Sequence, residues 1–385
     1  MIRRFAISLC VSVLLAACAQ EAPPAPPQPS YIAEGRPEAL SDWGQLAVGG
    51  GALVLGDQVT PYTLATGLFT DYAQKLRTVW IPASAGAAGY DAENAFDFPV
   101  GTVITKTFYY PRAEGGFERV LKASESGMAH YADRQLDLTA VRLIETRVLV
   151  HRETGWETLP YVWNDDQTEA RLMRAGAFVD LTLISEAGEQ ALGYLVPNVN
   201  QCAGCHETDT RDGLGSRPIG PRARHMNTDF EYFDGVANQI DQWSELGLLA
   251  DAPASEDAPR NASWTGELPL AGAALDDAAR AYLDINCSHC HSRTGPGDTS
   301  GLYLEPSEPV GPHLGVCKLP IAAGRGTGNR SYDIVPGASE DSILSYRLAS
   351  VQADVMMPEL GRALSHDEGV ALIAAWIDAM SGGCA

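Results

Sequence analysis

Hydrophobic and polar residues alternate with a period of two in the first half of the chain. Within residues 141–151, the positions that share one face are Ile144, Thr146, Val148 and Val150. Such alternation is typical of a strand with one buried face. A Glu-Thr-Gly turn at 153–155 then leads into a second run of strand-forming residues at 156–163. The pattern predicts a β-hairpin.

The same region contains further segments of strand character. Residues 100–110 are rich in β-branched and aromatic residues and are bounded by proline on both sides. This composition favours strands over helices. Strands are also expected at 178–184 and 191–196. We therefore predict a β-rich domain over residues 39–200.

The spacing of apolar residues changes to that of helices in the last third of the chain. The positions that repeat at helical intervals before Cys287 are Leu275, Ala278, Ala279, Tyr282 and Ile285. A second helical stripe is formed by Val370, Ile373, Ala374 and Ile377. Ser365 and Glu368 have the spacing of a capping box at the start of that second helix. We expect an α+β chain, in which the β-rich N-terminal domain is followed by a connector over 201–268 and an α-helical C-terminal domain over 269–385.

The first residues have the composition of an export signal. Two arginines precede an apolar stretch too short to span a bilayer, so residues 1–17 are expected to be a signal peptide. The Leu-Ala-Ala-Cys sequence that ends at Cys18 looks like a bacterial lipobox, which makes Cys18 the lipidation site. An ordinary signal peptide with a coincidental cysteine is the alternative. The proline-rich residues 18–38 would form an extended tether. We expect a periplasmic or cell-surface protein held by a lipid anchor, and because alanine rather than aspartate follows Cys18, the outer membrane is preferred.

Two copies of Cys-x-x-Cys-His carry the clearest chemistry of the chain. They are Cys202-Ala203-Gly204-Cys205-His206 and Cys287-Ser288-His289-Cys290-His291. In this pattern each cysteine sulfur adds to a haem vinyl group, and the histidine becomes an iron ligand. A single Cys-x-x-Cys is more often a zinc or thiol-redox site. Two complete copies in an exported chain predict two covalently bound c-type haems. A helix that leads into the second motif, a long loop region and a closing helix resemble the layout of a small cytochrome c, so we expect residues 269–385 to form a cytochrome c-like domain.

Charge limits the partners of the chain. The formal net charge is −22 at pH 7, and nucleic-acid binding requires a basic surface. We therefore expect no nucleic-acid partner. Cationic redox proteins of the periplasm would be steered toward such a surface, although solubility alone would also explain the charge.

The remaining cysteines form a pair. Of the eight, Cys10 lies in the signal segment, Cys18 is the lipidation site, and four belong to the haem motifs. Only Cys317 and Cys384 are left. An oxidising compartment favours a disulfide between them, and two free thiols are the alternative.

Eight segments in both halves of the chain carry a family resemblance. They are residues 98–102, 161–164, 219–224, 282–291, 315–318, 323–326, 333–337 and 356–362. In these segments the chain resembles a family of dihaem c-type cytochromes found as exported lipoproteins of Gram-negative bacteria. The resemblance extends over nearly the whole mature chain. It implies a dihaem protein and implies no particular substrate.

A second, weaker resemblance concerns residues 98–206. It is carried by a Gly-Thr-Val-Ile-Thr-Lys strand that ends at Lys106, a later Gly-Trp pair, and a haem motif at the end of the sheet. These features are similar to the β-sheet cytochromes of the P460 and c′-β type, which implies haem against a sheet and an iron that can keep an open site. Lys106 would then be a functional residue. An ordinary antiparallel domain with an exposed lysine is the alternative.

Methionine followed by proline at Met357 resembles the distal haem ligand of small cytochromes c. A thioether is a soft ligand that favours ferrous iron. Met356 is the second candidate, and a core role for both methionines is the alternative.

No distal ligand is evident for the first haem. The residues considered are Met128, His130, Met173, His225 and Met226, and an empty position is equally compatible. Pro221 and Pro312 follow the two motifs, and their carbonyls could accept the Nδ1 proton of the proximal histidines. Ordinary loop turns are the alternative.

These features together predict a membrane-tethered dihaem cytochrome that transfers electrons in the periplasm. The alternative is a haem enzyme with an open first haem, either a dihaem peroxidase or a P460-like oxidase of small nitrogen compounds. A β-rich first half argues against the peroxidase. Whether the chain is an enzyme stays open at this point.

Overall fold

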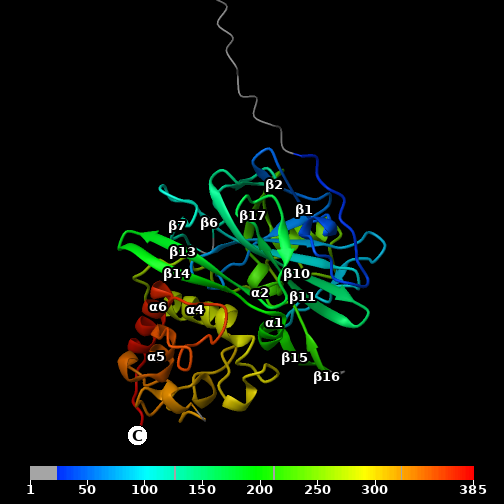
Figure 1. Ribbon diagram of the computed structural model, residues 1–385. Coiled ribbons are helices and arrows are strands. Elements are labelled where there is room, and N and C mark those ends of the chain that lie inside the picture. Colours follow the sequence, from blue (N-terminus) through cyan, green and yellow to red (C-terminus); the bar gives the residue numbers. More distant parts are fainter. Residues whose placement is uncertain (1–23, 125–126, 211–212, 322) are drawn as a thin grey trace, which may run out of the picture.

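The computed structural model describes residues 24–124, 127–210, 213–321 and 323–385 (Figure 1). The predicted signal peptide and the lipidation site Cys18 lie outside these residues. The α+β prediction is confirmed, because a β-rich region comes first and a more helical region follows. Strands continue beyond residue 200, to Leu249–Ala250 (β19), so the β-rich region includes the first motif and most of the predicted connector.

The largest element of the β-rich region is an antiparallel six-stranded sheet. Its strands, in spatial order, are β12 (Ala170–Leu172), β11 (Gly155–Trp163), β10 (Val141–Arg152), β6 (Val103–Pro111), β4 (Gln74–Trp80) and β3 (Thr60–Tyr62). The predicted hairpin is confirmed as β10 and β11, which are paired up to Arg152 and Gly155. Gly155 has φ of 105°, a conformation that glycine adopts without a steric penalty.

Smaller sheets complete the β-rich region. A four-stranded sheet contains β1 (Leu46–Gly49), β2 (Ala52–Leu55), β9 (Gln135–Asp137) and β8 (Tyr131–Ala132). A three-stranded sheet contains β14 (Gly188–Val196), β13 (Ala177–Ser185) and β7 (Arg119–Leu121). The remaining pairs are β15 (Glu207–Thr210) with β16 (Gly213–Ser216), β17 (Asp229–Tyr232) with β18 (Gly235–Asn238), and β19 with β5 (Ala88–Gly89).

The α-helices of the described residues are short, and the two with 12 residues lie in the second region. They are α1 (Val199–His206), α2 (Ala223–Met226), α3 (Gln239–Glu245), α4 (Gly272–Leu283), α5 (Ile343–Ala349) and α6 (Asp367–Asp378). Single turns of tighter helix occur at Leu40–Trp43, Asp298–Ser300, Pro312–Leu314, Gly324–Thr327 and Ser339–Asp341. The two predicted amphipathic helices correspond to α4 and α6.

The predicted capping box at the start of α6 is wrong. The N-cap is His366, whose side chain makes no capping hydrogen bond, and the Tyr72 hydroxyl accepts the Asp367 N–H at 3.0 Å instead. Glu368 instead accepts a hydrogen bond from Tyr72 and pairs with Lys122. Its partners thus lie in the β-rich region, and this tertiary contact replaces the local one.

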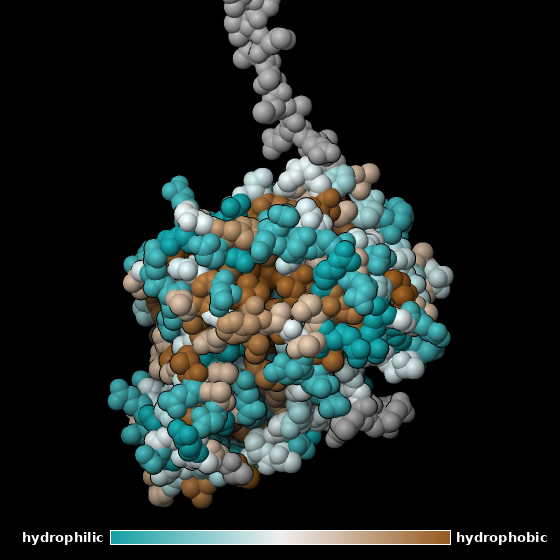
Figure 2. Space-filling model, in the orientation of Figure 1, coloured by the Kyte–Doolittle hydropathy of each residue, from teal (hydrophilic) through white to brown (hydrophobic). Residues whose placement is uncertain are grey.

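The two regions share hydrophobic cores. Ile285, next to the second motif, packs with sheet residues such as Phe98 and Ile104. Leu364, next to α6, packs with Phe108 and Tyr194. Figure 1 shows α4, α5 and α6 gathered at one end of the β-rich region. Figure 2 shows hydrophobic residues across the middle of this view, over the strands.

Candidate functional site

The first motif forms most of α1, directly after the last strand of the three-stranded sheet. The side chain of Asn198 accepts hydrogen bonds from the backbone N–H groups of Asn200 and Gln201. The Gln201 side chain in turn accepts one from the Asn198 N–H, which completes a capping box. The helix start is therefore fixed locally, and Cys202, Cys205 and His206 follow within its two turns.

The second motif begins in a wide helical turn. α4 continues into a π-type turn over Asp284–Ser288, which contains Cys287. The N–H groups of Cys290 and His291 both donate to the Cys287 carbonyl, at 3.1 and 2.8 Å. In both motifs the first cysteine is buried and the second is partly exposed, and all four thiols are free.

Asp284 anchors this turn in the protein. Its carboxylate is 1% exposed and accepts hydrogen bonds from Arg224 at 2.6 and 3.0 Å, from His225 at 2.8 Å, and from Asn261 at 2.7 Å. It also accepts the Ser288 hydroxyl at 2.7 Å. These donors hold the pKa of Asp284 well below its ordinary value despite burial. Sequence reasoning missed this residue, since a single aspartate before a motif gives no signal.

Folding brings the two motifs together. The ligand atoms of Cys205, His289 and Cys290 all lie within 4.8 Å of one another. The Thr208 hydroxyl donates to the Thr294 carbonyl at 3.0 Å, so the residues after each motif are also in contact. The contact with Cys290 and His289 lowers the pKa of the Cys205 thiol below its ordinary value. The same contact raises the pKa of Cys290.

Each motif histidine is held through Nδ1. His206 Nδ1 lies 2.7 Å from the Arg217 carbonyl, and His291 Nδ1 lies 3.3 Å from the Ser300 hydroxyl. Burial lowers the pKa of both histidines to about 4, so the neutral rings are the stable forms at neutral pH. A neutral imidazole held at Nδ1 offers Nε2 to a metal ion.

The expected proline carbonyls are not the partners of these histidines. The Pro221 carbonyl accepts the Phe96 N–H, and the Pro312 carbonyl accepts the Gly315 N–H. The hairpin β15–β16 explains the difference at the first motif. It pairs Glu207 with Ser216, which returns the backbone of Arg217 to the histidine that precedes the hairpin.

A cavity of about 580 Å³ adjoins the second motif. Cys287, Cys290 and His291 line it, and so does Met357, whereas Met356 is not among its lining residues. Cys205 of the first motif reaches its edge. The apolar part of the wall comes from Leu302, Leu304, Ile343, Leu344, Leu348 and Leu360. Two thiols, an imidazole and a thioether around one largely apolar cavity fit a c-type haem.

The first motif lies near a basic face of the six-stranded sheet. Arg77, Lys106 and Arg147 are cross-strand partners on β4, β6 and β10, so they share this face. Arg147 pairs with the buried Glu145. Burial lowers the pKa of His206, and Lys106 acts in the same direction. Burial raises the pKa of Cys202, and Arg147 opposes this effect. Sequence reasoning missed the two arginines, and the polar neighbours Gln74 and Lys75 in β4 leave no pattern that singles out Arg77.

The residues considered as distal ligands of the first haem have other surroundings. His225 is held by Asp284, Met226 is buried in a hydrophobic core, and Met128 packs against another. His130 is exposed, and Met173 is 39% exposed. The contacts of these five residues therefore identify none of them as a distal ligand.

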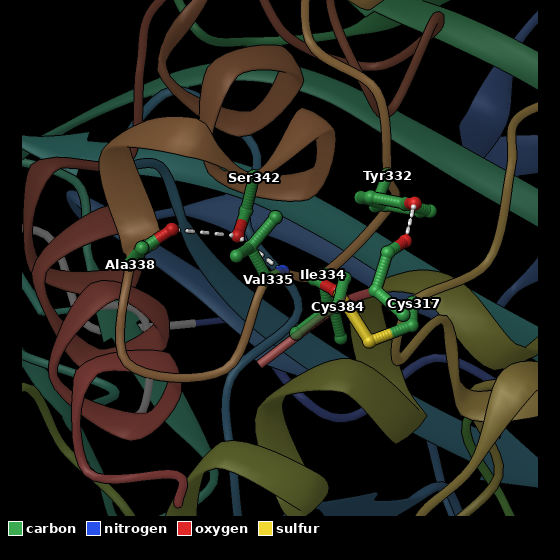
Figure 3. Close-up of a disulfide and its surroundings, with 8 residues drawn as sticks. Cys317, Tyr332, Ile334, Val335, Ala338, Ser342 and Cys384 are labelled. Carbon is green, nitrogen blue, oxygen red and sulfur yellow. Dashed lines mark hydrogen bonds between the residues drawn. A yellow bond between two sulfur atoms is a disulfide. The ribbon is translucent and has the colours of Figure 1, made fainter. Parts of the chain in front are cut away.

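Cys317 and Cys384, the two cysteines without another expected role, form a disulfide (Figure 3). The Cys317 N–H also donates to the Ile334 carbonyl at 2.9 Å. Nearby, the Tyr332 hydroxyl donates to the Ala385 carbonyl at 2.8 Å. The last residues are therefore fastened to the loop that follows the second motif.

Helices in the described parts of the chain are all too short or too polar to cross a membrane. Compared with known proteins, the chain matches no family model, no curated protein and no solved structure.

Proposed function

We propose that this protein is a dihaem c-type cytochrome that transfers single electrons. The observation that carries the proposal is the convergence of two complete Cys-x-x-Cys-His segments, with Cys205 and Cys290 among ligand atoms less than 4.8 Å apart. Since each of these cysteines would hold the edge of its own haem, the two haems would be neighbours. Short separation is what electron transfer between two centres requires.

The residues of each motif have distinct roles in this proposal. Cys202 and Cys205 would hold the first haem, and Cys287 and Cys290 the second. When bound, haem supplies an iron that is reversibly reduced by one electron. The contacts of His206 with Arg217 and of His291 with Ser300 fix the orientation of each ring.

The cavity of the second motif suits a haem with two protein ligands. His291 and Met357 line the same space, and soft thioether sulfur favours the reduced state. The apolar side chains of the wall would also raise the reduction potential, because the reduced iron carries less charge than the oxidised iron. The second site therefore has the features of an electron-transfer centre.

Partners and location follow from the charge and the first residues. A net charge of −22 favours redox partners with cationic surfaces. We infer a position in the periplasm or on the cell surface, with Cys18 as a lipid anchor and the outer membrane preferred. No nucleic-acid partner is proposed.

Haem content of variants with paired cysteine substitutions tests the proposal. The parent should carry two covalent haems by pyridine haemochrome analysis. Cys202→Ala/Cys205→Ala and Cys287→Ala/Cys290→Ala should each carry one. Cys317→Ala/Cys384→Ala is the matched control and should keep both haems, because it removes only the disulfide. A parent without covalent haem would refute the proposal.

One observation favours a second function. Cys205, His289 and Cys290 form a group of three soft or borderline ligands that would suit zinc or copper. Haem attachment and this metal site exclude each other, because attachment converts both thiols to thioethers. Metal analysis of the purified protein separates them: stoichiometric zinc or copper without haem would favour the second function.

A haem enzyme is the remaining alternative. Lys106 and Arg147 lie beside the first motif, and the five residues considered as distal ligands are engaged or exposed elsewhere. An open first haem would bind carbon monoxide or nitric oxide rapidly. Turnover of hydrogen peroxide, hydroxylamine or nitric oxide that His206→Ala abolishes would favour the enzyme over the carrier.

A further inference from the structure

Met357 lies in a segment without regular secondary structure. Residues 350–366 connect α5 to α6 through turns and bends only. A helix or strand would fix a side chain through repeating backbone hydrogen bonds, and this segment has only isolated ones, such as that from the Met357 N–H to the Arg347 carbonyl. Side chains that bind its backbone supply further contacts.

Arg362 binds several backbone carbonyls in and around this segment. Its side chain is buried, with 6% exposure for the residue. The guanidinium donates to the carbonyls of Leu364 at 2.9 Å, Met357 at 2.9 Å, Ser350 at 2.8 Å and Arg347 at 3.2 Å. One side chain thus joins the end of α5, the methionine and the residues just before α6.

Asp71, a residue of the β-rich region, binds backbone N–H groups of the same segment. It lies between β3 and β4, and the residue is 2% exposed. Its Oδ1 accepts the N–H groups of Ala363 and Leu364, both at 2.8 Å, and its Oδ2 accepts the Ala363 N–H at 2.9 Å. The carboxylate therefore binds the two residues that directly follow Arg362.

The same loop also contacts the second motif. Asn286, the residue before Cys287, accepts the Phe69 N–H at 2.8 Å and donates to the Gly67 carbonyl at 3.2 Å. Residues 67–71 therefore bind the cysteine side of the cavity and the methionine side at once. A relative shift of the two sides would break one set of these contacts.

The conformation and burial of Asp71 are both unfavourable by themselves. Its φ is 49°, in the left-handed region, and the Tyr110 hydroxyl donates to its carbonyl at 2.7 Å. Burial also raises the pKa of the carboxyl to about 6, against the effect of its two N–H donors. Residues held in an energetically unfavourable conformation often lie at functional sites.

We propose that Asp71, acting through the 362–364 segment, is a positioning residue for Met357. The β-rich region would thereby determine whether the second haem keeps its methionine ligand. This inference rests on the proposed function, because it takes Met357 as that ligand.

Asp71→Asn tests the inference in the full, haem-bound protein, and Asp133→Asn is a matched control. Asp133 has the same φ of 49° but is exposed. In Asp71→Asn the Ala363 and Leu364 amides should exchange about tenfold faster, since hydrogen bonds to a charged acceptor are lost. The second haem should shift from a low-spin His/Met spectrum toward high spin, with a lower midpoint potential. The control should change neither.

The outcomes separate this inference from the proposed function. A parent without haem refutes the proposed function, whereas amide exchange still reports the Asp71 contacts. An Asp71→Asn variant that keeps the parent spectrum and potential overturns the positioning role, whatever its amide exchange.

Two further measurements cover a variant that fails to fold. Arg362→Lys keeps the charge but cannot bind four carbonyls, and it should show the same loss of methionine ligation. In the unmodified protein, low urea concentrations should release the methionine and deprotect the Ala363 and Leu364 amides in one step. Release of the methionine while both amides stay protected would overturn the inference.

Discussion

At the scale of single residues, the chemistry of the second cavity depends on which of two adjacent methionines enters it. Met357 lines the cavity together with His291, and Met356 does not. The Met357 N–H donates to the Arg347 carbonyl and the Met356 N–H to the Gln352 carbonyl. Met357 is therefore held by the end of α5, and Met356 by the segment between α5 and α6.

Replacement of Met357 by alanine should lower the midpoint potential of the second haem. Loss of the thioether removes the ligand that favours ferrous iron. The His/Met spectrum should disappear, as measured by optical and EPR spectroscopy with a redox titration. Met356→Ala should leave spectrum and potential unchanged. The reverse pattern would make Met356 the ligand.

Asp71 should give the protein a pH-dependent stability. Its folded pKa of about 6 is above the unfolded value of about 3.9, so the folded protein binds more protons between these values. This group stabilises the fold below about pH 4, and up to about 3 kcal/mol of that stability is lost as the pH rises through 6. Asp71→Asn should remove this loss, as urea unfolding at pH 4 and pH 7 would measure. The groups around it are Arg362, Lys75 and the N–H groups of Ala363 and Leu364. Parallel pH profiles of parent and variant would contradict the assignment.

At the scale of elements, the π-type turn Asp284–Ser288 attaches the second motif to the β-rich region. The carboxylate of Asp284 binds Arg224 and His225 at α2, while its own backbone continues α4. A buried carboxylate with several donors gives the junction one defined geometry.

Asp284→Asn should reduce the free energy of unfolding by about 3–5 kcal/mol, because it leaves the buried Arg224 without its counter-charge. Urea or thermal unfolding measures the loss. Asp277→Asn is the control on the same helix, and its exposed side chain predicts a change within about 0.5 kcal/mol. Equal effects of both variants would show that the Asp284 network contributes little.

At the scale of the whole molecule, the cavity at the second motif depends on both regions. The helical region supplies Cys287, Cys290, His291 and Met357, and Cys205 of the β-rich region also lines it. Residues 67–71 of the β-rich region bind Asn286 and the segment that follows Met357. We therefore expect the helical region to need the β-rich region for a stable second site.

A lipid on Cys18 should anchor the protein to a membrane. Cys18→Ala should move the protein from the membrane fraction to the soluble fraction, because acyl chains contribute about 0.8 kcal/mol per buried CH₂. Cell fractionation with immunodetection measures this. Retention of the variant in the membrane fraction would mean that something other than a lipid on Cys18 holds it.

Local patterns in the sequence predicted the long elements, whereas most of the short strands and helices were not predicted. The period of two gave β10, β11, β13 and β14, and helical spacing gave α4 and α6, because burial of one face depends mainly on residues a few positions apart. The capping box at Ser365 and the proline carbonyls failed. In both cases a residue distant in sequence replaced the local partner: Tyr72 and Lys122 bind Glu368, and the β15–β16 hairpin returns Arg217 to His206.

The sequence by itself determined the α+β organisation and the two Cys-x-x-Cys-His segments as the candidate site. Covalent chemistry at such a motif needs only a few adjacent residues, so its pattern is visible in the chain. Only the tertiary structure decided that Cys205 meets Cys290, that Met357 rather than Met356 shares a cavity with His291, and that Asp71 binds the segment between them and α6. These contacts join residues far apart in sequence, and their distances depend on how the sheets and helices pack.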